Sequence, residues 1–193
     1  AHTLGALTRI LAGYIDKMDL IIISDYDKGL VTRELVARIV ELAKKSGVMS
    51  LADPKSMDFF YFLGVTVLTP NKKEAAIAAG IQIQTPEDMD GAAAKLMAVA
   101  DLEKLLITCG KAGMVLYEIG KPSVAIASKA RQVFDVSGAG DTVISFLGLG
   151  LASGATFKAA AELANLAAGI VVAKVGTATA SIDELKQYIM INV

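Results

Sequence analysis

The sequence predicts an α/β protein with a mostly parallel sheet, helices on both faces and an antiparallel hairpin at one edge. Short apolar runs such as Leu20–Ile23 and Val65–Leu68 have the length of parallel strands that helices cover on both faces. Strand and helix segments alternate along the chain, which is typical of this class. Hydrophobic residues make up 54% of the 193 residues, above the usual share for a soluble protein. We therefore expect one domain over residues 1–193 with a large buried core.

Caps and breakers bound the expected elements of the first half. Gly47 ends a helix, Pro70 breaks the strand before it, and Thr85-Pro86 followed by two acidic residues opens a helix. Helices are expected at 4–17, 32–45, after Asn71 and at 85–100, with a helical turn at 57–63. Strands are expected at 20–24, 48–52, 65–68 and 104–108.

The second half begins with a hairpin and ends in helices. Strands at 114–118 and 123–127 are separated by Gly120-Lys121-Pro122, a turn sequence. Ser153-Gly154 separates helices expected at 140–152 and 156–175. Ser181-x-x-Glu184 is a capping box that opens a last short helix. We find no repeat and no linker.

Composition excludes several classes of function. The chain has 19 basic and 20 acidic residues without a basic cluster, and no tryptophan, which argues against nucleic acid as a partner. The most apolar long segment, 159–175, contains Glu162, Asn165 and Lys174, so we expect a buried helix and not a membrane span. We find no signal peptide. Cys109 is the single cysteine, which excludes an internal disulfide and agrees with a reducing cytoplasm. One histidine and one cysteine disfavour a transition-metal site.

The segment Asp135-Val136-Ser137-Gly138-Ala139-Gly140-Asp141 places two glycines and a carboxylate just before an apolar stretch. If a helix begins near Gly138, its first N–H groups and its dipole suit a phosphoryl group, which the glycines allow to approach closely. Asp141 in the first turn could accept a proton from a substrate hydroxyl. The residues alone leave a simpler interpretation open, in which Asp141 caps the helix and the glycines form a tight turn.

Asn71-Lys72-Lys73-Glu74 follows the strand expected at 65–68. Asn71 and Glu74 have the spacing of a capping box, which needs no function. A glutamate in the first turn of a helix is also well placed to hold a hydrated Mg²⁺ between phosphate oxygens. Both interpretations can hold at once.

Two further features need an interpretation, and the first lies beyond the carboxyl end of a strand, where an open parallel sheet binds its ligands. Thr108-Cys109-Gly110-Lys111-Ala112-Gly113 follows the strand at 104–108 and could be a plain hairpin entry. Asn165 is a polar amide inside an apolar helix, where the simplest expectation is a core amide that bonds to backbone groups.

Together these motifs resemble the ribokinase or pfkB family of sugar kinases. The resemblance implies that Asp141 is the catalytic base and that Gly138, Ala139 and Gly140 form the anion hole. Ser137 stands where the family more often has threonine, and it keeps a hydroxyl.

The same resemblance implies ATP and Mg²⁺ as cofactors, with the ion held by Glu74 through water. Thr108, Gly110 and Gly113 would lie along the nucleotide, and Asn165 beside the adenine pocket, which Lys174-Val175-Gly176-Thr177 would close. The nucleotide-binding residues that it implies are Asn71, Lys72, Lys73, Glu74, Thr108, Gly110, Gly113 and Asn165.

A narrower resemblance, running from about Gly13 to Ile189, is to the kinase domain of heptose kinase/adenylyltransferase enzymes. These enzymes phosphorylate D-glycero-D-manno-heptose 7-phosphate at the anomeric hydroxyl, on the way to ADP-heptose for the lipopolysaccharide core. The residues alone leave a loop ion pair between Asp25 and Lys28 and a simple turn at Asp53-Pro54 open. The motifs that carry the resemblance by occurring together in this order are Ser24-Asp25-Tyr26-x-Lys28-Gly29, Asp53-Pro54-Lys55, Leu68-Thr69-Pro70-Asn71 and Val175-Gly176-Thr177.

Members of the family have a long N-terminal portion, with a sugar-gripping lid sheet, before the strand expected at 20–24. We expect the present chain to be the C-terminal, nucleotide-binding portion of a cytoplasmic kinase without that part, with a sheet edge and apolar faces exposed. Expected partners are ATP, a sugar phosphate, a second copy or the N-terminal portion, and a fused or separate adenylyltransferase, but neither nucleic acid nor membrane. Two alternatives stay open: another sugar or nucleoside kinase such as ribokinase or fructokinase, and a non-catalytic nucleotide-binding module.

Overall fold

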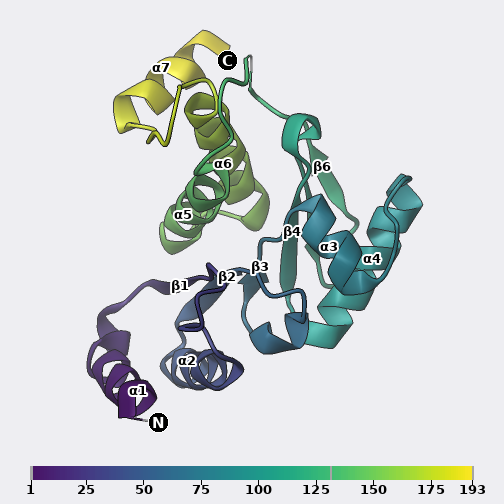
Figure 1. Cartoon of the computed structure of the whole chain (residues 1–193). Coiled ribbons are helices and arrows are strands. Elements are labelled where there is room, and N and C mark those ends of the chain that lie inside the picture. The colour runs from purple at the N-terminus through teal and green to yellow at the C-terminus, as the bar shows by residue number, and fades with distance from the viewer. Residues whose placement is uncertain (1, 131, 193) are drawn as a thin grey trace. The chain divides into compact units, whose positions relative to one another are not determined.

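The computed structural model describes residues 2–130 and 132–192, with side chains for 4–130 and 132–190. Its strands are β1 (Leu20–Ser24), β2 (Met49–Asp53), β3 (Val67–Leu68), β4 (Lys104–Thr108), β5 (Met114–Glu118) and β6 (Val124–Ile126). They form one sheet in the order β1-β2-β3-β4-β5-β6, of which Figure 1 labels β1 to β4 and β6. β1 to β4 pair in parallel and β5 pairs antiparallel with β6. The α/β class, the mostly parallel sheet and the hairpin at its edge are confirmed.

Helices connect the strands at nearly all the expected places. They are α1 (His2–Tyr14), α2 (Arg33–Ser46), α3 (Lys72–Ala79), α4 (Pro86–Ala100), α5 (Ala139–Ala152), α6 (Phe157–Val171) and α7 (Ile182–Asn192). Single 3₁₀ turns occur at η1 (Ile15–Lys17), η2 (Phe59–Phe62) and η3 (Gly110–Ala112).

The chain divides into two compact units. Unit 1 is Ala1–Thr108 with Tyr117–Ser123, and unit 2 is Cys109–Leu116 with Val124–Val193.

Unit 1 is built on the parallel strands. Leu51, Val67 and Leu105 are fully buried in β2, β3 and β4, and α2 packs against β2 while α3 and α4 pack against β4. The helix expected at 32–45 is present with caps at both ends: the Thr32 hydroxyl accepts a hydrogen bond from the Leu35 N–H at 3.2 Å at the start of α2, and Gly47 ends α2 as predicted. These caps fix the ends of the helices and thereby the loops that follow each strand.

Two details of unit 1 differ from expectation. β3 has only two residues instead of the four at 65–68, because the Val65 N–H closes the preceding turn by donating to the Phe62 carbonyl. In β1, Ile21 and Ile23 are buried but Ile22 is 38% exposed. Within the described residues, β1 is therefore covered by other parts of the chain mainly on one face.

Unit 2 is centred on the pair α5 and α6, which pack along each other. Ile144 and Leu147 of α5 and Ala160 and Ala164 of α6 have almost no exposed surface. The unit also holds β6, η3 and α7, and the Ser181–Glu184 capping box predicted for α7 is present in both directions.

α6 ends at Val171 and not near residue 175 as expected. The carbonyl of Val172 accepts hydrogen bonds from the N–H groups of Phe134 and Asp135, at 2.8 and 3.3 Å. The Lys174 N–H turns back to the Val171 carbonyl. This loop therefore takes the carbonyl that a longer helix would have needed for its own next turn.

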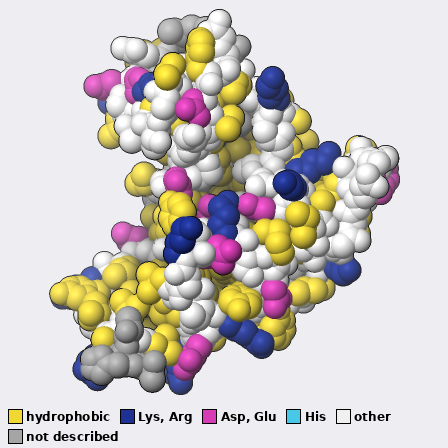
Figure 2. Space-filling view, in the orientation of Figure 1, with side chains coloured by type: hydrophobic (Ala, Val, Ile, Leu, Met, Phe, Trp, Pro, Cys, Tyr) yellow, Lys and Arg dark blue, Asp and Glu magenta, His cyan; other side chains and the backbone are white. Residues whose placement is uncertain are grey.

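Figure 2 shows basic and acidic side chains interspersed over the visible face, whereas hydrophobic side chains gather over α1. Ile10 and Tyr14 of α1 are each more than half exposed. Within the described residues, we find no helix with the length and hydropathy needed to cross a bilayer.

Candidate functional site

In unit 1, the predicted site residues lie at the carboxyl ends of β3 and β4. Asn71 forms a parallel bridge with Thr108, and the Thr108 N–H donates to the Pro70 carbonyl at 3.0 Å. Because neighbouring parallel strands end at the same edge of a sheet, the motif after β3 and the motif after β4 begin side by side. The structure thus brings Asn71 and Thr108 together, as expected.

Asn71 and Glu74 form a complete capping box at the start of α3. The Asn71 Oδ1 atom accepts from the Glu74 N–H at 2.9 Å, and the Glu74 Oε2 atom accepts from the Asn71 N–H at 2.8 Å. The capping interpretation is confirmed. Lys72 and Lys73 lie between them in the first turn and are exposed.

Glu74 has a second partner that sequence reasoning did not place in the site. Its Oε1 atom lies 3.0 Å from the Lys55 Nζ atom, and the Glu74 side chain is only 11% exposed. Lys55 follows β2, and β2 pairs with β3. The Asp53-Pro54-Lys55 motif was the available signal, but only the pairing of the two strands puts Lys55 beside Glu74.

Two buried carboxylates shape the loops at the same end of β1 and β2. Asp25 is 4% exposed, and its carboxylate accepts hydrogen bonds from the N–H groups of Asp27 and Ser56, at 2.9 and 3.4 Å. The Asp25 N–H donates to the carbonyl of Asp53, itself nearly buried. Asp25 therefore holds the chain on either side of Lys55 in place through backbone N–H groups, and among the described residues it forms no ion pair with Lys28.

The donor set in unit 1 fits a magnesium ion that keeps most of its water. Mg²⁺ in phosphate-transfer sites is bound by one or two carboxylates, by substrate phosphates and by several water molecules. Glu74 provides one such carboxylate. No cluster of three or more His, Cys, Asp or Glu side chains suited to a metal is found among the described residues.

In unit 2, the glycine-rich segment forms the N-terminus of α5. Gly138 is the N-cap with φ of 77°, a left-handed conformation that favours glycine. The Asp135 Oδ1 atom accepts from the Ser137 N–H at 2.9 Å. This bond, with lesser contributions from the N–H groups of Gly176 and Val136, lowers the pKa of Asp135. The turn that presents Gly138 is therefore held by a carboxylate that stays ionised.

Asp141 lies in the first turn of α5 and is exposed to solvent. Gly140 is inside the helix, and the Ala139 N–H donates to the Val136 carbonyl at 3.2 Å. The arrangement combines a positive helix terminus with an exposed carboxylate in the same first turn. It can hold an anionic group and accept a proton from a neighbouring hydroxyl.

The loop with Gly110 and Gly113 has a structural reason for its second glycine. Gly113 has φ of 97°, and a Cβ atom there would lie 2.0 Å from the Ile126 carbonyl oxygen and 2.6 Å from the Ser128 N atom. Gly110 opens η3 with φ of 55°. The close approach at Gly113 is to this chain's own backbone, which supports the hairpin-entry interpretation for that position.

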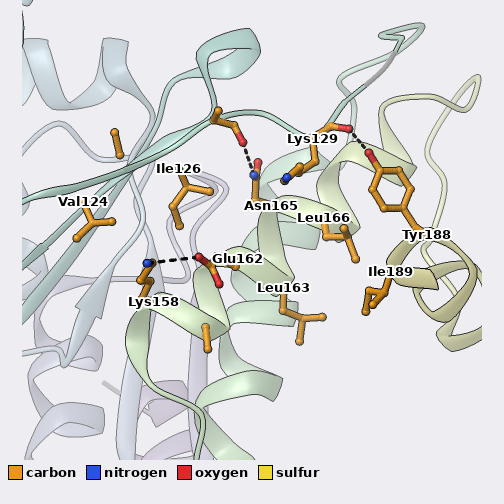
Figure 3. A pocket seen from close by; sticks show the side chains of 13 residues that line it. Val124, Ile126, Lys129, Lys158, Glu162, Leu163, Asn165, Leu166, Tyr188 and Ile189 are labelled. Carbon is orange, nitrogen blue, oxygen red and sulfur yellow. Dashed lines mark hydrogen bonds and ion pairs between the residues drawn. The ribbon is translucent and has the colours of Figure 1, made fainter. Parts of the chain in front are cut away.

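Asn165 lines a cavity of about 610 Å³ within unit 2 (Figure 3). Its Nδ2 atom donates to the Ala127 carbonyl at 2.7 Å, and its side chain is buried. Residues of β6, of α6 and of α7 line the cavity, which has the volume of a small-molecule site. Asn165 is thus both a satisfied core amide and a wall of a cavity.

α7 contributes a wall of this cavity that the sequence did not point to. Figure 3 shows Tyr188 reaching from α7 toward the chain after β6, where its hydroxyl donates to the Lys129 carbonyl at 2.5 Å. Ile189 also lines the cavity. On the opposite side Lys158 and Glu162 form an ion pair at 3.8 Å.

The sequence matches a family model over nearly its whole length. The pfkB family carbohydrate kinase model covers residues 6–184. A bifunctional protein HldE from Desulfatibacillum aliphaticivorans is 52% identical over 181 residues, which are 94% of this chain and 37% of that protein. Its namesake in Geobacter sulfurreducens is 46% identical, over 88% of this chain and 35% of the relative. The chain thus spans little more than a third of the length of these curated relatives.

Solved structures share the fold. Arabidopsis thaliana ribokinase, in complex with ribose and ATP, superposes with a TM-score of 0.82 at 21% identity, over 92% of this chain and 57% of that one. Escherichia coli phosphofructokinase-2, in complex with potassium, gives a TM-score of 0.81 at 19% identity, over 96% of this chain and 62% of that one. The fold is ribokinase-like.

Proposed function

Because this chain belongs to the pfkB family of carbohydrate kinases, we propose that it forms the nucleotide-binding part of an ATP-dependent kinase acting on heptose 7-phosphate. The observation that carries the proposal is the start of α5. There, left-handed Gly138 opens a helix that has Asp141 exposed in its first turn. This pairs an anion-binding helix end with a proton acceptor, as phosphoryl transfer to a hydroxyl requires.

In the proposed reaction, Asp141 accepts the proton of the anomeric hydroxyl. The sugar oxygen bonds to the terminal phosphorus of ATP, the bond from that phosphorus to the bridging oxygen breaks, and ADP leaves. Gly138, Ala139 and Gly140 stabilise the charge on the phosphoryl oxygens through their backbone N–H groups. The Ala139 N–H would exchange its bond to Val136 for this role.

The nucleotide is assigned to the residues that the family resemblance implies. Asn71, Lys72, Lys73, Glu74 and Thr108 would contact phosphates, Glu74 holding a magnesium ion through water, and Gly110 and Gly113 would lie along the nucleotide. Bound magnesium would neutralise charge between phosphate oxygens. The adenine base is assigned to the cavity beside Asn165, whose mixed apolar and polar lining suits a heteroaromatic ring.

The sugar is assigned from the relatives. Several proteins at 40–52% identity are named bifunctional protein HldE, and the Asp25, Asp53 and Lys55 motifs are those of the heptose kinase/adenylyltransferase enzymes. We therefore propose a cytoplasmic step on the way to ADP-heptose for lipopolysaccharide, with an adenylyltransferase domain in the same or another chain.

The test measures ADP release from ATP and Mg²⁺, with and without D-glycero-D-manno-heptose 7-phosphate, alongside calorimetric ATP binding. It uses both the 193-residue chain and the product of its complete reading frame. Release that requires the heptose phosphate supports the proposal, and release with ribose or fructose 6-phosphate instead points to another sugar kinase. ATP binding without release from either protein would support a non-catalytic module.

A further inference from the structure

Lys55 and Glu74 form an ion pair between loops that follow adjacent strands. β2 and β3 are paired in register through Leu51 with Val67 and Ala52 with Leu68, so their following loops leave the sheet side by side. Lys55 Nζ and Glu74 Oε1 are 3.0 Å apart. The pair therefore lies at the ligand-binding edge of the sheet and not on a remote surface.

The Lys55 and Glu74 side chains differ in how exposed they are to solvent. Glu74 is nearly buried, and its other oxygen is held by the Asn71 N–H at 2.8 Å. Lys55 is 42% exposed and ends a flexible four-carbon chain. If the pair is to be broken, the ammonium moves and the carboxylate stays.

Stability alone gives a weak reason for a lysine at this place. A partly exposed ion pair contributes little to folding because solvent screens it. The surroundings are acidic, since Asp25 and Asp53 are buried at the ends of the neighbouring strands. A lysine here is a positive charge at an edge that would otherwise repel a phosphate.

We propose that Lys55 is a phosphate-binding residue that exchanges partners when the nucleotide binds. Its ammonium leaves Glu74 Oε1 for an oxygen of the terminal phosphate, and Glu74 Oε1 becomes available to water of the magnesium ion. Each side chain would keep a partner of opposite charge, because the hydrated ion would replace the ammonium beside Glu74 and the phosphate would replace the carboxylate beside Lys55. This inference rests on the proposed kinase function.

The experiment compares two nucleotides by titration calorimetry on the protein made from the complete reading frame. One is ADP with Mg²⁺, and the other is a non-hydrolysable ATP analogue with an imido bridge, also with Mg²⁺. Lys55→Met is expected to weaken binding of the analogue about 10- to 100-fold, the usual effect of losing a hydrogen bond to a charged group, and to leave ADP within about twofold. Lys55→Arg keeps a cation and is expected to keep most of the preference for the analogue.

The matched control is Lys45→Met, which removes a lysine paired to Glu41 at 2.7 Å on the exposed face of α2. It is expected to change neither affinity. Equal loss for both nucleotides in Lys55→Met, or loss for neither, would overturn the assignment. So would unchanged nucleotide binding with a raised KM for the sugar phosphate, which would make Lys55 a ligand of the sugar's phosphate. If Lys55→Met does not fold, the test uses Lys55→Arg alone. A Lys55→Arg protein that keeps the wild-type melting temperature but has no preference for the analogue would also overturn the assignment. A wild-type protein that binds neither nucleotide contradicts the kinase function itself.

Discussion

At the scale of single residues, Asp141 carries the most specific expectation. It is an exposed carboxylate in the first turn of α5, next to the proposed phosphoryl-binding turn. Asp141→Asn removes the proton acceptor but keeps the shape of the side chain. We expect turnover in the protein from the complete reading frame to fall by about 10²- to 10⁴-fold, the range for loss of a general base. Calorimetric ATP binding should stay nearly unchanged.

Asp183→Asn is a suitable control, because Asp183 also lies in the first turn of a helix and is exposed. It should leave turnover unchanged. An Asp141→Asn protein that loses nucleotide binding as fully as turnover would contradict the role as base, since the residue would then be needed to bind the nucleotide.

Gly113 is predicted to be a stability position. Replacement by alanine puts a Cβ atom 2.0 Å from the Ile126 carbonyl oxygen in a left-handed conformation, so backbone must move. Gly113→Ala should lower the free energy of unfolding by about 1–3 kcal/mol or more from overpacking, in addition to the cost of the backbone conformation. Gly120→Ala separates the two effects, because Gly120 has φ of 75° but open space around its Cβ position. Chemical denaturation of both variants measures the difference, and equal losses would contradict the packing argument.

At the scale of elements, α7 is fastened by an ion pair at its start. Lys174 Nζ lies 2.6 Å from Glu184 Oε1 and also donates to the Thr179 carbonyl. The hydrogen bond from Lys174 is the largest cause that lowers the pKa of Glu184 from 4.5 to about 2, with the Ser181 N–H next. The pair thereby ties the loop after α6 to the helix that provides Tyr188 to the cavity.

The lowered pKa gives a pH dependence with a definite sign. Because Glu184 holds its proton less tightly when folded, its stabilising contribution is present above its ordinary pKa of 4.5 and is lost as the pH falls toward about 2. The difference in melting temperature between wild type and Glu184→Gln should be constant above about pH 5 and shrink below pH 4.5. Since both side chains are about a third exposed, we expect it to be small and to decrease with salt. Lys174→Met should give the same profile; a difference that grows with acid would refute the pairing.

Local signals predicted most of the elements. Thr85 and Ser181 cap helices at the expected residues because a cap depends only on neighbours in sequence. The end of α6 was missed because the Val172 carbonyl is taken by Phe134, a partner far away in sequence. The two-residue β3 was missed for a similar reason, since a turn from η2 reaches into the expected strand.

The residues of the candidate site also fall into two groups, those that local sequence specifies and those that it does not. The residues of contiguous motifs, such as Asn71 with Glu74 and Gly138 with Asp141, could be named from the sequence because spacing alone defines them. Lys55 and Tyr188 join their partners across distances of 19 and 59 residues in sequence. No pattern in one sequence specifies such pairs, and strand order or helix packing has to supply them.

At the scale of the whole molecule, the chain carries apolar surface and little net charge. β1 is the first strand of the sheet, and among the described strands only β2 pairs with it. Ile22 in the middle of β1 is 38% exposed, and Ile10 and Tyr14 of α1 are more than half exposed. An apolar edge strand is a template for pairing with another chain. The net charge of −1 at pH 7 provides little repulsion against such contact.

We therefore expect the 193-residue chain on its own to self-associate through β1, increasingly with protein concentration and as the pH approaches the pI of about 5.9. Sedimentation velocity at several concentrations measures this. Ile22→Lys places a charge at the centre of the edge strand, which protects natural edges from pairing, and should shift the chain toward monomer. Ile119→Lys adds the same charge at a 67% exposed apolar position in the turn after β5 and should act only through net charge. If both variants reduce association equally, net charge and not the β1 edge governs it; a chain that stays monomeric at every concentration would show that the exposed apolar surface is tolerated in water.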